Sequence, residues 1–125
     1  MSVPTSNTAR IMRKRFGSWL KETRESTGLT QLDVATILDY AYHTTVSQIE
    51  RGVSALPPAE LHLYAEAIRV NPKKLAEMYL YYIEPYVYAA IYGKDPYVLE
   101  NLPRPDTTIR RREARVSKLV TKSDS

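Results

Sequence analysis

The stretch between Gly28 and Gly52, GLTQLDVATILDYAYHTTVSQIERG, leaves little freedom in how this chain folds. Apolar residues recur in it at three- and four-residue steps, in two short runs. That spacing is typical of helices that bury one face. Glycine commonly follows the last residue of a helix, because it adopts left-handed backbone angles without steric cost. The stretch therefore predicts two short helices that are joined by a turn and packed on one side.

A capping signal defines the first of these helices, which we expect over Gln31 to Leu38. Thr30 offers a hydroxyl N-cap, and Asp33 at the third helical position completes an Asp variant of the capping box. Ala35 is expected where a neighbouring helix approaches closely. Asp39 is the expected turn residue, since Asp tolerates left-handed angles. The residues expected to face inward are Val34, Ile37 and Leu38.

The second helix is expected from about His43 to Arg51, with Val46 and Ile49 pointing into the core. Its opposite face presents donors and acceptors of a size that can hydrogen-bond to base edges in the major groove of DNA; Gln can pair bidentately with adenine. Any surface helix also shows polar residues, so this face alone leaves both interpretations open. The polar residues are His43, Thr44, Ser47 and Gln48.

Further helices flank this pair. The spacing predicts a preceding helix from Arg10 to Thr27, with an inward face of Ile11, Met12, Phe16, Trp19, Leu20 and Thr23. Pro57 and Pro58 introduce a later helix, whose inward residues are Leu61, Tyr64, Ala65 and Ile68, with His62 exposed. Asn71 and Pro72 form a cap and first-turn pair that starts another, continuing through Leu75, Met78, Tyr79 and Tyr82.

The basic residues at the start of the first helix have two interpretations. They either contact phosphates or form a solvated charged face. These residues are Arg10, Arg13, Lys14 and Arg15.

The order of these pieces resembles a known family. GLTQ, Ala35, VSQIERG and AEAIRVNPKKLAEM, spread over Phe16 to Leu80, are similar to the Cro and phage-repressor type helix-turn-helix domain, the XRE family. The resemblance implies an all-α fold: a five-helix, repressor-like DNA-binding domain over residues 10–82. Residues 1–9 are small and polar without a helical period, so we expect a flexible start.

The same resemblance implies roles for individual residues. His43, Thr44, Ser47 and Gln48 match the positions that contact DNA bases. Gln31 and Arg51 match positions that contact phosphates, and at Gln31 the start of the helix also favours an anion. Arg24 and Glu50 match a structural ion pair that lies outside the DNA-binding site.

The turn between the two helices departs from the family pattern. DYAYHTT carries about one extra residue, and Asp39 replaces the customary turn glycine. The usual Ser or Thr cap of the second helix would fall on Tyr42, a poor N-cap, so the helix is predicted to start a residue or two away. Tyr40 is expected to be buried in the turn.

Seven of the ten tyrosines lie between Tyr79 and Tyr97. Pro85 and Gly93 bound a predicted helix, and Asp95 with Pro96 begin a short one to about Leu102. A strand over residues 86–92 is the alternative, but no second strand is evident for pairing. The tyrosine-rich extension, residues 83–102, either closes the core or forms a two-fold interface. We expect a homodimer, with interface residues Tyr79, Tyr82, Tyr86, Tyr88 and Tyr92.

The charge excess of the chain lies in its last segment. Residues 1–100 carry 11 basic and 11 acidic side chains, whereas residues 101–125 carry 7 and 3. We expect the tail, residues 103–125, to be disordered in isolation. Its arginines either add phosphate attraction without sequence preference or keep the protein soluble. They are Arg110, Arg111, Arg112 and Arg115.

Composition excludes several other functions. There is no cysteine, and His43 and His62 have no recognisable metal spacing, so neither metal nor cofactor is expected. No nucleophile and base combination suggests an enzyme, and no apolar run is long enough for a membrane helix.

Together these features predict a transcriptional regulator. We expect it to be a repressor that binds a quasi-palindromic operator in double-stranded DNA as a dimer, in the cytoplasm of a prokaryote or as a phage product. The alternative is an antitoxin-like module that binds another protein through its tyrosines, with DNA binding secondary.

Overall fold

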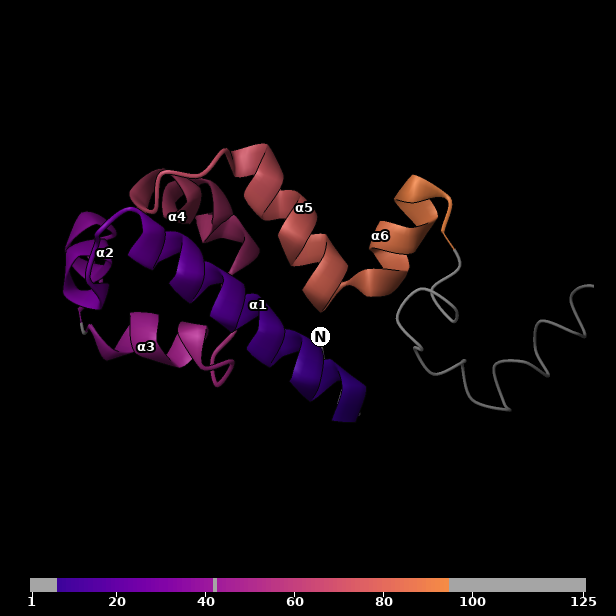
Figure 1. Ribbon diagram of the computed structural model, residues 1–125, viewed down its shortest axis with the longest axis horizontal. Helices are drawn as coiled ribbons and strands as arrows, with labels where there is room; N and C mark the ends of the chain where they lie inside the picture. The colour runs from indigo at the N-terminus through magenta and orange to yellow at the C-terminus, as the bar shows by residue number, and fades with distance from the viewer. Residues whose placement is uncertain (1–6, 42, 95–125) are drawn as a thin grey trace, which may run out of the picture. The chain divides into compact units, whose positions relative to one another are not determined.

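The chain is helical throughout the part that the structure, a computed structural model, describes: residues 7–41 and 43–94. No strand occurs in these two ranges, which confirms the predicted all-α class and the helical interpretation of residues 86–92. The elements in order are α1 (Asn7–Ser26), α2 (Gln31–Ile37), α3 (Thr44–Glu50), the 3₁₀ turn η1 (Pro58–Glu60), α4 (Leu61–Ala67), α5 (Pro72–Ile83) and α6 (Pro85–Tyr92). Figure 1 labels the α-helices.

Short-range chemistry at the helix ends explains most of these boundaries. Before α2, the Thr30 hydroxyl accepts a hydrogen bond from the Asp33 backbone N–H. The Asp33 carboxylate in turn accepts one from the Thr30 backbone N–H, which completes the predicted capping box. The Asn71 side chain caps α5 by accepting from the Lys73 N–H. Pro85 takes the first turn of α6, and Gly93 ends it with left-handed angles.

The core forms where α1 packs against α3 and α5, and where α2 and α4 pack together. Tyr64, Leu20, Ile68, Leu75, Val34 and Val46 are its largest fully buried side chains. Ala35 is also buried, as expected for a position of close helix approach. Helices α1 to α5 therefore share one apolar core, and α6 follows α5 and packs against it.

Two residues expected to face inward are exposed. Ile11 is 41% exposed because the buried row of α1 runs through Met12, Phe16 and Leu20, and Ile11 lies about 100° around the helix from Met12. Ile37 is 58% exposed, since the buried side of α2 is centred between Val34 and Ala35. Both predictions were wrong because helical spacing does not fix how wide the covered face is.

The turn between α2 and α3 uses the predicted residue. Asp39 adopts left-handed angles, with φ of 56°, and the Tyr40 N–H donates to the Ala35 carbonyl at 2.9 Å. Tyr40 packs partly buried against the core, and its hydroxyl donates to Glu60 at 3.3 Å. Burial, with the nearby Glu60 carboxylate, raises the pKa of Tyr40 to about 12, so the hydroxyl remains a donor at neutral pH.

Helix α3 begins later than the family pattern implies. His43 precedes its first residue, Thr44, and makes no side-chain capping bond, so the predicted displacement of the helix start is confirmed. The helix is one residue shorter at each end than the expected His43 to Arg51. Tyr42, the expected helix to Leu102 and the arginine-rich tail lie outside the described residues.

Gly17 lies in the middle of α1, where this helix meets the end of α3. A Cβ added at Gly17 would sit 2.8 Å from the Ile49 carbonyl oxygen and closer still to that of Glu50. A Cβ at Gly52 would sit 3.1 Å from the Lys14 Cα. The two backbones are therefore in direct contact, and only glycine fits at position 17.

Gly17→Ala is expected to destabilise the protein by about 2 kcal/mol or more, because the methyl group would overlap backbone carbonyls that end α3. The direction of this change in stability is informative, since alanine in a helix interior is otherwise favoured over glycine by up to about 1 kcal/mol. Urea unfolding measures the change, with the neighbouring exposed Ser18→Ala as a control expected within about 0.5 kcal/mol. An unchanged Gly17→Ala midpoint would contradict the close contact.

Candidate nucleic-acid interface

The polar face of α3 points away from the core. Val46, Ile49 and Glu50 are buried, whereas His43 and Thr44 are exposed and Ser47 and Gln48 are half-buried. Residues three and four positions apart on a helix are neighbours on its surface, so the four predicted base-contacting residues form one continuous strip. The strip consists of His43, Thr44, Ser47 and Gln48.

Gln48 is held by the loop that follows α3. Its side-chain Oε1 accepts from the Ser54 hydroxyl at 3.3 Å, and its backbone carbonyl accepts from the N–H groups of Val53 and Ser54. A carbonyl oxygen has two lone pairs, so Gln48 retains one acceptor site besides its two N–H donors. This is the set that a bidentate pair with adenine requires. The sequence interpretation did not include Ser54, because nothing local marks a loop serine as an orienting residue.

Gln31 lies at the start of α2, beside the end of α3. Its Nε2 donates to Glu50 Oε1 at 2.9 Å, which leaves a second N–H on the same nitrogen. Arg51 is exposed just after α3, where its Nε reaches the Ser47 carbonyl at a long 3.4 Å. Gln31 and Arg51, the two predicted phosphate-contacting residues, both line one open depression next to the strip on α3.

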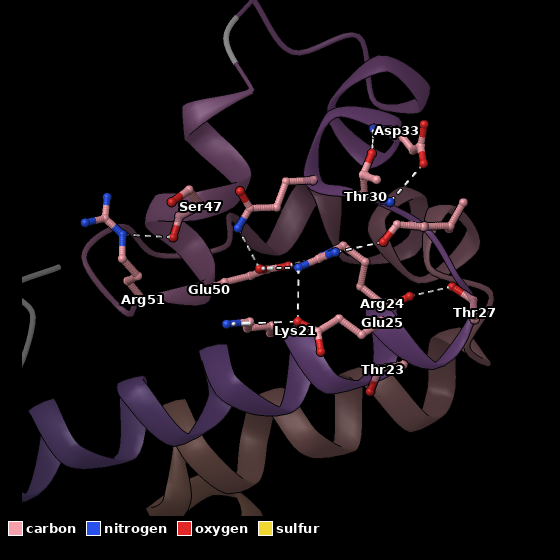
Figure 2. A network of polar contacts seen from close by, with 12 residues as sticks. Lys21, Thr23, Arg24, Glu25, Thr27, Thr30, Asp33, Ser47, Glu50 and Arg51 are labelled. Atoms are coloured by element: carbon pink, nitrogen blue, oxygen red, sulfur yellow. Dashed lines mark hydrogen bonds and ion pairs between the residues drawn. The ribbon is translucent and has the colours of Figure 1, made fainter.

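A buried ion pair lies beneath this surface, as Figure 2 shows. Arg24 Nε donates to Glu50 Oε2 at 2.7 Å and Nη2 donates to Oε1 at 3.0 Å, a bidentate arrangement. Arg24 Nη1 also donates to the Leu29 carbonyl at 2.7 Å. The two residues are 6% and 5% exposed, so the predicted structural role of this pair is confirmed. It joins α1 to the last turn of α3.

The tyrosines proposed as an interface divide into two groups. Tyr79 and Tyr82 pack against Phe16, with ring centroids 5.9 and 6.1 Å away, so they contribute to the core of a single chain. Tyr86 and Tyr92 on α6 are 44% and 43% exposed. Tyr88 lies between the groups, in ring contact with Tyr81 and Tyr92.

Residues 7–41 and 43–94 contain neither a cluster of metal ligands nor a helix able to span a membrane. No group of three or more His, Cys, Asp or Glu side chains there is arranged to hold a metal ion. Within the same residues, none of the helices has the length and apolarity to cross a membrane.

Removing one partner of the buried pair is expected to be costly. Glu50→Ala should lower the free energy of unfolding by about 3 to 5 kcal/mol, because it leaves the buried Arg24 guanidinium with only a longer, 3.7 Å contact to the exposed Glu25 carboxylate. Replacing both, with Arg24→Met and Glu50→Leu, should recover much of that loss. Lys21→Ala is the matched control, because its pair with Glu25 is 4.0 Å long and exposed. Equal effects of Glu50→Ala and Lys21→Ala in urea unfolding would contradict the structural role.

Comparison with known families agrees with this geometry. The family model described as "Helix-turn-helix" matches residues 20–75, from the last third of α1 to the first turn of α5. No match was found among curated proteins or solved structures. The match contains the capped α2, the left-handed turn at Asp39, the polar strip of α3 and the Arg24–Glu50 pair. Residues 20–75 are therefore a helix-turn-helix domain of the Cro and phage-repressor (XRE) type, a domain of DNA-binding regulators.

Proposed function

We propose that this regulator recognises a specific operator in double-stranded DNA with α3 in the major groove, and that it acts as a repressor. The observation that carries the proposal is the polar strip on α3, whose opposite face is fixed to the core by Val46, Ile49 and Glu50. A rigid helix that presents a glutamine amide and hydroxyl groups matches the donors and acceptors of base edges. Occupying an operator blocks polymerase, the simplest route to regulation.

The residue roles follow from their positions. His43, Thr44, Ser47 and Gln48 contact bases, with Gln48 paired to an adenine. Gln31 and Arg51 contact the flanking phosphates and set the register of the protein along the duplex. The resemblance to Cro and phage repressors further implies a prokaryotic or phage protein that works in the cytoplasm.

The role of Gln48 is tested by comparing two kinds of DNA. Gln48→Ala should weaken binding to an operator, recovered by selection from random duplexes, by about 1 to 3 kcal/mol, because a bidentate base contact is lost. Binding to random duplex should stay nearly constant. Leu32→Ala, an exposed change on α2, is the control. An equal loss on both DNAs would restrict Gln48 to backbone contacts and contradict its proposed role.

We also propose that two copies pair through α6. Val87 and Ile91 lie four residues apart on this helix and are 44% and 60% exposed, and Tyr86 and Tyr92 add aromatic area nearby. Apolar and aromatic side chains of this kind are favoured in the centres of interfaces. Two half-sites one helical turn apart supply the affinity that one short recognition helix lacks. Tyr79 and Tyr82 would then support the interface from the core side.

Ile91→Asp is expected to convert the dimer to a monomer in analytical sedimentation, because it would bury a charge between the two copies. Leu63→Asp on α4 is the matched control, since Leu63 is 57% exposed and lies on another helix. Wild-type protein that sediments as a monomer at micromolar concentration would contradict the dimer. A different protein co-purifying in stoichiometric amount and lost on Ile91→Asp would favour the antitoxin-like alternative.

A further inference from the structure

Three of the seven residues that line the depression beside α3 come from a helix that the proposed function does not use. Three residues of α1 line it at four- and three-residue steps: Lys14, Ser18 and Lys21. Gln31 from the start of α2, and Ser47 and Arg51 from α3, complete the lining above the buried Glu50. Figure 2 shows Lys21, Ser47 and Arg51 on one side of the ion-pair network.

The exposed charge of this depression is positive. Glu50 is its one acidic lining residue, but the Glu50 side chain is only 2% exposed and its oxygens accept from Arg24 and Gln31. Lys21 has an exposed acidic neighbour, Glu25, at 4.0 Å, and such a pair contributes little and is easily exchanged. An anion entering the depression therefore meets the ammonium groups of Lys14 and Lys21 and the guanidinium of Arg51.

The position of the depression indicates which anion. Ser47 belongs both to the polar strip of α3 and to the lining, so the two surfaces are continuous. A duplex that places base edges against the strip brings its own backbone alongside. The hydroxyls of Ser18 and Ser47 and the free N–H of Gln31 are neutral donors suited to phosphate oxygens.

We propose that this depression holds one backbone phosphate of duplex DNA, and that Lys14 and Lys21 of α1 grip it together with Arg51 and Gln31. The proposal rests on the DNA-binding function and adds a contact from outside the helix pair. Because α1 touches the last turn of α3 at Gly17, a phosphate bound to both helices fixes the angle at which α3 enters the groove. The lysines thus position the recognition helix without contacting bases.

The test removes both ammonium groups from the full-length chain as Lys14→Gln with Lys21→Gln. Loss of one phosphate contact should lower the slope of log affinity against log salt concentration by about 1, on both random duplex and selected operator. Lys73→Gln with Lys74→Gln is the matched control, because these lysines are also exposed but lie on α5, outside the depression. Urea unfolding should show all variants as stable as wild type.

A second measurement locates the phosphate. Single linkages of the selected operator are replaced by neutral methylphosphonates. Wild type should lose affinity at one linkage per half-site, and the Lys14 and Lys21 double variant should be insensitive at that linkage only. An unchanged salt slope, or an equal fall in the α5 control, would overturn the proposal while leaving DNA binding intact. Wild type that binds neither duplex would instead refute the proposed function.

Discussion

The contact between α1 and the last turn of α3 is the constraint on which the rest of this domain depends. Two kinds of force meet there. Backbone is pressed against backbone at Gly17, and the Arg24 guanidinium is paired with the Glu50 carboxylate inside the protein. The steric contact sets the distance between the helices, and the bidentate pair sets their rotation, because its geometry is directional. Apolar packing by Phe16 and Ile49 then fills the remaining space.

The same carboxylate links the fold to the DNA-binding surface. Gln31, at the start of α2, donates to Glu50, so one buried acid is bonded to residues of two other helices. Because the Glu50 carboxylate is buried and its oxygens accept these hydrogen bonds, it contributes little negative charge to the surface above it. A protein whose charge is balanced over residues 1–100 can therefore still present a local cluster of cations where a polyanion would dock.

Much of this arrangement follows from local chemistry and could be predicted from sequence. Thr30 with Asp33, Asn71 with Pro72, and Pro85 with Gly93 each define a helix end through their own backbone geometry. The rest depends on contacts between distant segments. From sequence alone, Gly17 only lowers the helix propensity of its segment. Its role becomes clear from the contact with the backbone of α3. Packing between distant segments also determines how much of each helix is covered, and this leaves Ile11 and Ile37 exposed. The contact by which Ser54 orients Gln48 likewise depends on the folded loop.

The two ends of α3 are held very differently. Its last turn is fixed by the ion pair and the glycine contacts, whereas its start has no side-chain cap and follows a turn of unusual length. The polar anchoring of α3 is therefore concentrated in its last turn. His43 and Thr44 are exposed, so their replacement is expected to leave the fold intact. In the proposed binding mode, replacements at His43 and Thr44 would change target preference without cost to the fold, whereas Gln48 is tied to the loop after α3 through Ser54.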